Sequence, residues 1–206
     1  MQSFDVLIIG GGVSGMQCAL ILGSGLKNAY AKDKKIGIIS HQKSSHLQNA
    51  LFNNALGVQP GTLGKDILIQ GKNQLTSQYP GVLQINNEKV IELVFQEKGY
   101  QLITTNGSYF SKIVVVALNY SKPFLIKGLE KYLISHQRAN PSKDRIQLKN
   151  NDLLVEKNLF VCGTIAGFRS QFAIAAGSGA IVATDILTLW NKGMPTKVHD
   201  KIKKPS

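Results

Sequence analysis

The sequence predicts an α/β fold of three layers, with a central parallel sheet and a small antiparallel β-meander. After Asp5, residues 6–9 form a continuous run of branched apolar side chains, typical of a strand buried on both faces of a parallel sheet. Glycines end that run at once, and residues 13–25 then place apolar and small side chains at helical spacing. A second branched run at residues 36–39 completes a strand, helix, strand unit.

The next segments predict a second helix and the meander. Between Leu63 and Gln78 the apolar positions share one helix face, and Pro80 stops the helix because proline lacks a backbone N–H. Strand-like segments follow at residues 82–85, 89–95, 100–105 and 110–118. The turn Asn106-Gly107 joins the last two as a hairpin, so we expect these strands to form a meander that returns to the main sheet.

The last third of the chain predicts a strand and a long helix. Residues 119–158 are lysine-rich and weakly periodic, so we expect loops with one or two short elements there. Residues 159–162 form another buried strand that ends in glycine, and residues 171–190 form a long apolar helix that packs closely through Gly177 and Gly179.

Length and charge indicate one domain with a basic end. The chain has 206 residues, with 24 Lys and Arg against 12 Asp and Glu, a formal charge of +12. We expect a single domain over residues 1–190, whose halves 1–119 and 158–190 are joined by the short connection 120–157, and a basic tail over 191–206. The basic cluster at 197–204 is interpreted as a solvated tail. The alternative, a nucleic-acid arm, is disfavoured because no recognition motif accompanies the charge.

Several other classes of protein are excluded by pattern. The longest apolar runs fall short of the roughly 20 residues that span a bilayer, and the first residues do not resemble a signal peptide. The two cysteines, Cys18 and Cys162, form no CxxC pair, and the four histidines lack metal-ligand spacing. We therefore predict a cytoplasmic protein that has no metal and no membrane partner.

The glycine segment predicts a dinucleotide site. Residues 10–15 fit GxGxxG between a predicted strand and a predicted helix, the arrangement of Rossmann-like FAD/NAD(P)-binding folds. Gly10 permits a tight turn, Gly12 lets the backbone approach a pyrophosphate, and Gly15 lets helix and strand pack closely. The N–H groups of Val13 and Ser14, at the helix N-terminus, then face the phosphates. The alternative is a glycine-rich turn that holds no ligand.

The expected acidic partner of the ribose is missing. Ser40 and His41 stand at the end of the second strand, where a carboxylate is usual. A serine hydroxyl can still hydrogen-bond a ribose, so both residues remain candidates for adenosine binding. His41 is interpreted equally well as an exposed polar residue.

Four segments in order resemble one family. They are the glycine loop at residues 4–15, Asn49-Ala50-Leu51-Phe52-Asn53-Asn54-Ala55-Leu56-Gly57, the strand end Val116-Ala117-Leu118-Asn119, and residues 158–179 with Cys162-Gly163-Thr164 and Gln171-Phe172-Ala173. Together they resemble the FAD domain of thioredoxin reductase-like flavoproteins, the pyridine nucleotide-disulfide oxidoreductase family. The resemblance covers both ends of the chain.

The resemblance implies bound FAD and assigns residues to it. Gly10, Gly12, Ser14 and Gly15 would hold the pyrophosphate, and the backbone of Lys89 and Val90 would lie near the adenine. Gly163 and Thr164 would lie beside the ribityl chain. Gln171, Phe172 and Ala173 would meet the pyrimidine edge of the flavin, where a helix dipole favours negative charge. Ala117, Leu118 and Asn119 mark the family's strand end, and Asn49 and Asn54 are candidates for isoalloxazine contacts.

Three departures from the family pattern bear on function. Thr164 replaces the family aspartate, which removes a charge-assisted hydrogen bond to the ribityl hydroxyls. Asn119 replaces a family glycine. Full-length members also insert an NAD(P)H domain with a CxxC between the two halves, and here only residues 120–157 occupy that place, so the chain looks like a stand-alone FAD domain.

Two functions remain open at this stage. The first is a flavin-dependent oxidoreductase that passes electrons through FAD to or from an external donor, acceptor or partner protein, without thiol-disulfide exchange. The second is a non-catalytic module in which FAD is structural. By family analogy we also expect a homodimer.

Single residues with less specific signals complete the analysis. Cys18 and Cys162 are interpreted as buried core residues, with a thiol acting on the cofactor as the alternative for Cys162. Tyr120 and Tyr132 could stack on a ligand, although packing or surface roles are the more usual interpretation.

Overall fold

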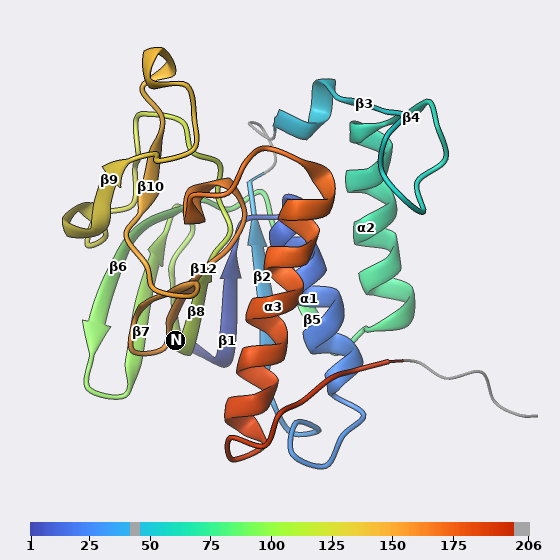
Figure 1. The fold of residues 1–206 in the computed structure, drawn as a ribbon. Helices are drawn as coiled ribbons and strands as arrows, with labels where there is room; N and C mark the ends of the chain where they lie inside the picture. Colours follow the sequence, from blue (N-terminus) through green and yellow to red (C-terminus); the bar gives the residue numbers. More distant parts are fainter. Residues whose placement is uncertain (42–45, 200–206) are drawn as a thin grey trace, which may run out of the picture.

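A mostly parallel sheet forms the centre of the molecule, in the strand order β11-β12-β8-β1-β2-β5 (Figure 1). The computed structural model describes residues 1–41 and 46–199. The strands of the sheet are β1 (Gln2–Ile9), β2 (Ile36–Ser40), β5 (Val82–Asn86), β8 (Ser108–Val116), β11 (Leu154–Glu156) and β12 (Leu159–Val161). β1 runs parallel to both β2 and β8, and β12 runs parallel to β8. The predicted α/β class with a parallel central sheet is confirmed.

β1 is buried from Val6 to Ile9. Val6, Leu7 and Ile8 have no exposed surface, so side chains on both faces of the strand are covered. That burial explains the unbroken apolar run, because a strand with one wet face would alternate apolar and polar residues.

Three helices pack beside one another over one face of the sheet (Figure 1). α1 (Val13–Gly25) lies between α3 (Phe172–Trp190) and α2 (Gly64–Gln78). A Cβ on Gly179 of α3 would lie 2.0 Å from the carbonyl oxygen of Ser14 in α1. The two helix backbones therefore touch at a point where only glycine fits.

The antiparallel meander consists of β6 (Val90–Gln96), β7 (Gly99–Thr104) and β8. β7 pairs with the first half of β8, and β12 pairs with the second half, so β8 joins the meander to the parallel sheet. The prediction that residues 82–85 belong to the meander is wrong. They form β5, which pairs in parallel with β2, because α2 lies between the two strands and returns the chain to the same end of the sheet.

The connection between β8 and β12 has more structure than expected. It contains the hairpin β9 (Leu133–Ser135) and β10 (Ile146–Leu148), then β11, and short 3-10 turns at Glu130–Tyr132 and Pro141–Lys143. A second small hairpin, β3 (Leu51–Phe52) with β4 (Thr62–Leu63), precedes α2 and follows the 3-10 turn His46–Asn49. Of the predicted basic cluster at 197–204, residues 200–204 lie outside the described residues.

α3 is a longer apolar segment than the sequence analysis predicted. The helix has 19 residues with a mean hydropathy of 1.7 in its most apolar window, so by length and composition it could cross a membrane. Its inner face is nevertheless buried against the domain through Val182, Ala183, Ile186 and Leu187. Such a pattern is also that of a core helix of a globular domain.

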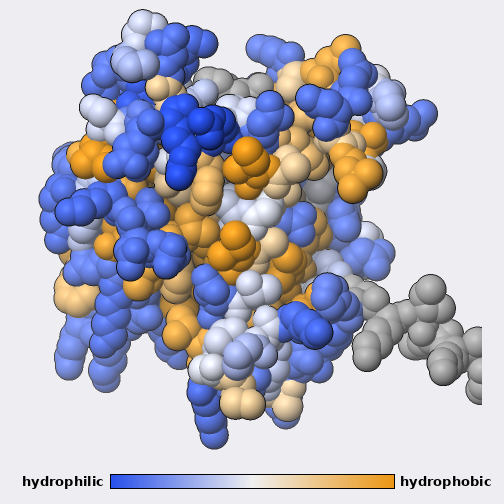
Figure 2. Space-filling view, viewed as in Figure 1, coloured by the Kyte–Doolittle hydropathy of each residue, from blue (hydrophilic) through white to orange (hydrophobic). Residues whose placement is uncertain are grey.

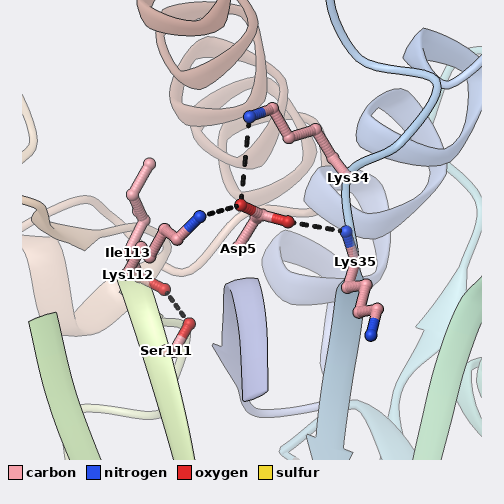
Figure 3. Close-up of polar contacts among 6 residues, drawn as sticks. All are labelled: Asp5, Lys34, Lys35, Ser111, Lys112 and Ile113. Carbon is pink, nitrogen blue, oxygen red and sulfur yellow. Dashed lines mark hydrogen bonds and ion pairs between the residues drawn. The ribbon is translucent and has the colours of Figure 1, made fainter.

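Asp5, in the first half of β1, ties three segments together (Figure 3). One carboxylate oxygen accepts the backbone N–H of Lys35 at 2.9 Å, and the other lies 2.9 Å from Lys112 Nζ and 3.9 Å from Lys34 Nζ. Burial alone would raise the pKa of this carboxyl, but the Lys35 N–H, Lys112 and Lys34 together hold the pKa below its ordinary value. The anion therefore stabilises the approach of β2 and β8 to β1.

Replacing Asp5 with asparagine should lower the free energy of unfolding by about 1 kcal/mol at pH 7, because an amide keeps an acceptor but loses the charge. The folded-state pKa is lowered, so the stabilisation is complete above the unfolded pKa of about 3.9 and disappears as the pH falls through the folded value. Urea unfolding at pH 7 and near pH 2.5 measures it. Asp33→Asn, at an exposed position, is the matched control; an equal loss in both variants would contradict this role of Asp5.

Candidate functional site

A cavity opens at the carboxyl ends of β1 and β8, where α1 and α3 begin. This is the edge of an open α/β sheet at which ligands usually bind. Six groups of residues line it, from the glycine loop, the end of β2, the segment around β3, the end of β8, the turn after β12 and the start of α3. They are Gly10, Gly11, Gly12, Val13, Ser14, His41, Leu47, Ala50, Phe52, Ala117, Leu118, Asn119, Tyr120, Gly163, Thr164, Ser170, Gln171, Phe172 and Ala175.

The three glycines of the GxGxxG motif, Gly10, Gly12 and Gly15, have different structural roles. Gly10 has a φ of +117°, and a Cβ there would lie 2.3 Å from the carbonyl oxygen of Ala117. A Cβ on Gly15 would lie 2.0 Å from the carbonyl oxygen of Gly10, so both positions exclude side chains for packing reasons. A Cβ on Gly12, by contrast, would meet no atom within 4 Å. The lack of a side chain at Gly12 therefore leaves space open in the cavity. At Gly10 and Gly15, by contrast, it permits close packing within the protein.

Two helix N-termini contribute to the cavity wall. Gly12 is the N-cap of α1 and Gln171 is the N-cap of α3, and neither helix has a side-chain cap or an acidic residue in its first turn. The lining contains no carboxylate among the described residues. The partial positive charges of the two helix ends therefore act on the cavity without an opposing anion, which favours a ligand with negative charge.

The loop after β12 is fixed from α3. The backbone N–H of Gly163 donates to Ser178 Oγ at 2.9 Å, and that hydroxyl donates to the carbonyl oxygen of Ala175 at 2.7 Å. Gly163 has a φ of +78°, and a Cβ there would lie 2.6 Å from Ser14 Oγ. This close approach holds Thr164 beside the N-terminus of α1.

An aromatic pair closes one side of the cavity. The rings of Phe52 in β3 and Phe172 in α3 meet edge to face with centroids 5.2 Å apart. Phe52 is buried, and Phe172 and Gln171 line the cavity, whereas Ala173 is exposed outside the lining. Of the predicted segment 171–173, the first two residues thus line the cavity and the third does not.

Tyr120 forms part of the cavity wall, and the sequence analysis had left its role open. The Arg145 guanidinium lies 5.0 Å from the centroid of the Tyr120 ring, and the His136 ring meets it edge-on at 5.3 Å. His136 Nδ1 accepts the backbone N–H of Arg138 at 3.1 Å. Nε2 therefore carries the proton of the neutral ring and donates to the carbonyl oxygen of Thr164, also at 3.1 Å. The connection 120–157 in this way supports both Tyr120 and Thr164.

Ser40, at the end of β2, and His41, which follows it, differ in their relation to the cavity. His41 is exposed and lines the cavity. Ser40 is buried, and its hydroxyl donates to Asn86 Oδ1 at 3.0 Å rather than toward the cavity. In this arrangement the Ser40 hydroxyl is already used by β5.

Five other predicted residues lie outside the cavity lining. Asn49 and Asn54 are exposed beside the β3–β4 hairpin. Lys89 exchanges hydrogen bonds with Thr105, whose backbone N–H donates to the Lys89 carbonyl at 2.9 Å, and Val90 is buried in β6. Gly15 lies directly behind the glycine loop. Leu47, Phe52, Tyr120 and Ala175 are lining residues that the sequence analysis did not assign to the site.

Both cysteines are buried close to the cavity, with no exposed surface. Burial raises the pKa of Cys162 to about 12, although a hydrogen bond from Ser14 acts in the opposite direction. Burial, with a smaller contribution from Cys162, raises the pKa of Cys18 well above its ordinary value. Within the described residues, no cluster of three or more His, Cys, Asp or Glu side chains could hold a metal.

The folded protein should therefore resist thiol reagents. At pH 8 both thiols stay protonated, since their pKa values are raised, and neither sulfur is accessible. We expect Ellman's reagent to titrate no thiol on the timescale of mixing and two thiols after unfolding in guanidinium. Rapid reaction of one cysteine in the native protein would contradict the burial of that thiol.

The fold and the cavity at the ends of β1 and β8 define an α/β domain of the Rossmann-like type. The model of the pyridine nucleotide-disulphide oxidoreductase family matches residues 4–181. The chain therefore belongs to that family, as the resemblance implied. None of the curated protein sequences matches it.

Solved structures of similar fold carry related descriptions. One is a thioredoxin reductase from Gloeobacter violaceus, with 14% identity, a TM-score of 0.73 and coverage of 99% of this chain and 100% of that chain. Another is a ferredoxin-flavin thioredoxin reductase from Clostridium acetobutylicum, with 15% identity, a TM-score of 0.69 and coverage of 93% and 99%. A third is the atypical thioredoxin reductase TRi from Desulfovibrio vulgaris Hildenborough, with 12% identity, a TM-score of 0.68 and coverage of 94% of this chain and 100% of that chain. At these identities the likeness concerns the fold.

Proposed function

We propose that this protein binds FAD in the cavity and passes electrons through it between an external donor and acceptor, without thiol-disulfide exchange. One observation carries the proposal: within a chain of this family, two uncapped helix N-termini and the open space at Gly12 face one cavity whose lining holds no carboxylate among the described residues. FAD supplies the electron-carrying ring when bound. The residues of the cavity bind and orient it.

The residues present fit such a cofactor. The space above Gly12 and the N–H groups at the start of α1 suit a pyrophosphate, because a backbone without Cβ allows close approach and the helix end favours negative charge. The start of α3, at Gln171 and Phe172, offers the same field to the pyrimidine edge of a flavin. Thr164 offers a neutral hydroxyl to the ribityl chain.

The electron route must involve another molecule. Residues 120–157 connect β8 to β12 through a small hairpin, and they carry no second glycine fingerprint for a nicotinamide nucleotide. One structural neighbour is described as a ferredoxin-flavin thioredoxin reductase. By analogy, a partner protein that delivers electrons is one candidate, and direct docking of a nicotinamide nucleotide is the other.

A second candidate function is a module in which FAD is structural. The burial of Cys18 and Cys162 favours it, because raised thiol pKa values and inaccessible sulfurs leave no dithiol to receive electrons. A structural cofactor stabilises the folded state by mass action without turnover.

An absorption spectrum separates these functions. The purified protein is recorded before and after incubation with FAD, and NADH or NADPH is then added without oxygen. Flavin bands that bleach support an oxidoreductase with direct access for the nucleotide. Bands that persist with nucleotides but bleach with a reduced ferredoxin support the partner route, and bands that resist both favour the structural cofactor. Failure to take up FAD would overturn the proposal.

We also propose a cytoplasmic homodimer as the working form, by family analogy. The outer face of α3 exposes Ile174, Ile181 and Leu189, and Figure 2 shows apolar side chains along this helix. An apolar face of this kind is consistent with a partner subunit. Sedimentation velocity tests the proposal, and a monomer at all concentrations would contradict it.

A further inference from the structure

A second pocket lies on the other side of the turn that carries Thr164. It opens between the β9–β10 hairpin and the 3-10 turn Thr164–Ala166, in the upper left of Figure 1. Figure 2 shows a mostly hydrophilic surface over this corner. The pocket is lined by Ile134, Gln137, Arg138, Gln147, Lys149, Asn150 and Ala166. Thr164 lines the first cavity and Ala166 lines this one, so a single turn separates the two.

A buried amide in this pocket has an unused donor. Gln147 is only 5% exposed, and its Oε1 accepts the backbone N–H of Gln137 at 2.9 Å. That bond fixes the orientation of the amide, because an NH₂ group cannot accept. Nε2 has no hydrogen-bond partner within residues 1–41 and 46–199. Among the described residues, Arg145 Nε is the one fully buried side-chain polar atom without a partner, so Gln147 Nε2 is reached by solvent and is free to donate to a ligand.

Two cations flank the amide, and they have no carboxylate partner among the described residues. Arg138 is held by a hydrogen bond from Nη1 to the carbonyl oxygen of Gly167 at 3.1 Å, and its guanidinium lies 5.9 Å from the centroid of the Phe168 ring. Lys149 is exposed at the rim and forms no ion pair in that part of the chain. The guanidinium is thus fixed beside the pocket before any ligand arrives.

Asn150 explains why the pocket attracts anions rather than cations. Its Nδ2 donates to the carbonyl oxygens of Leu148 and Ala166, and its Oδ1 accepts the N–H of Leu153. The acceptor of Gln147 is likewise used by Gln137. The side-chain groups left for a ligand are therefore donors and positive charges.

We propose that this pocket is an anion site that takes a phosphate group, either as free phosphate or as part of a nucleotide. A phosphate offers several strong acceptor oxygens, which match the Arg138 fork, the Lys149 ammonium and the Gln147 amide. The site lies outside the cavity proposed for FAD and does not depend on FAD being bound. A ligand here would contact the same turn whose other face borders that cavity.

NMR of the ¹⁵N-labelled full chain after incubation with FAD tests the site. Inorganic phosphate, adenosine monophosphate and adenosine are titrated separately at constant ionic strength, and the amide signals of Gln137, Arg138 and Gly167 are followed. Saturable shifts with both phosphate compounds and none with adenosine support the proposal. Tighter binding of the nucleotide identifies it as the source, whereas equal affinity identifies free phosphate. Shifts confined to Gly10–Gly15 would overturn the proposal, whether or not the protein takes up FAD.

Matched variants assign the binding to these side chains. Arg138→Gln should weaken phosphate binding about tenfold, since it removes one charge-assisted contact. Gln147→Glu keeps the acceptor for Gln137 but replaces the unused donor with a carboxylate, and it should abolish binding. Lys98→Gln removes the same charge from an exposed turn far along the chain and should leave the affinity unchanged. Equal affinities in the Arg138 and Lys98 variants would overturn the assignment, even if Gln147→Glu fails to fold.

Discussion

Replacing Gly12 with aspartate should abolish FAD binding and leave the fold intact. Gly12 is the N-cap of α1, with φ −78° and ψ −175°, a conformation that aspartate adopts readily. A Cβ there meets no atom within 4 Å, so the side chain has room and can cap the free N–H groups of the helix. The carboxylate then occupies the position proposed for the pyrophosphate. At about 4 Å, repulsion between such charges weakens binding on the order of 100-fold or more.

Two measurements check this expectation. Thermal unfolding of the variant without added flavin should match or exceed that of the native protein, because aspartate is a slightly better N-cap than glycine. Flavin fluorescence or absorbance after gel filtration should show no retained FAD. Gly177→Asp adds the same charge on the exposed face of α3, where a Cβ also meets nothing within 4 Å, and should retain FAD. Equal retention by both variants would place the cofactor elsewhere.

Replacing Gly179 with alanine should strongly destabilise the contact between α1 and α3. The added Cβ would lie 2.0 Å from the carbonyl oxygen of Ser14 and 3.1 Å from the backbone nitrogen of Cys18. Both are backbone atoms of α1, so the helices must separate. Overpacking of this kind costs about 3 kcal/mol, which corresponds to a decrease in Tm of roughly 6–12 °C for a chain of this size.

Gly177→Ala is the control for helix propensity. It lies two residues away in the same helix, and it should raise stability by about 0.5–1 kcal/mol because alanine has less conformational entropy to lose on folding than glycine does. Differential scanning calorimetry of both variants gives the contrast. If the two changes had the same sign, the close contact between α1 and α3 would not limit stability.

Local patterns predicted the elements that depend on neighbouring residues. The bounds Val13–Gly25 of α1 were predicted correctly, because the glycine loop and the helical spacing that follows are both local signals. The pairing of β5 was missed because strand partners are set over long distances. The helix between residues 64 and 78 was the available signal, since a helical connection favours parallel pairing.

The site was predicted in part for the same reason. The glycine loop, Gly163, Thr164 and Gln171 line one cavity, since family-like motifs stand at strand ends that a parallel sheet brings together. Sequence could not reveal that Ser40 donates to Asn86, because a hydroxyl's partner depends on its rotamer and on a strand 46 residues away. Tyr120 depends on His136 and Arg145, and the weak periodicity of residues 120–157 gave no reason to expect them beside it.

The position of the connection between β8 and β12 shows where a different unit could be inserted into such a chain. It leaves the sheet at the carboxyl end of β8 and returns at the start of the neighbouring parallel strand, in register with Val114–Val116. Any unit that spans those two points preserves the register, whatever its length, and its first residues lie over the cavity mouth. A domain inserted between these strands would therefore begin beside the cavity proposed to hold FAD. In this chain, the hairpin of residues 133–148 lies within the unit that spans those two points.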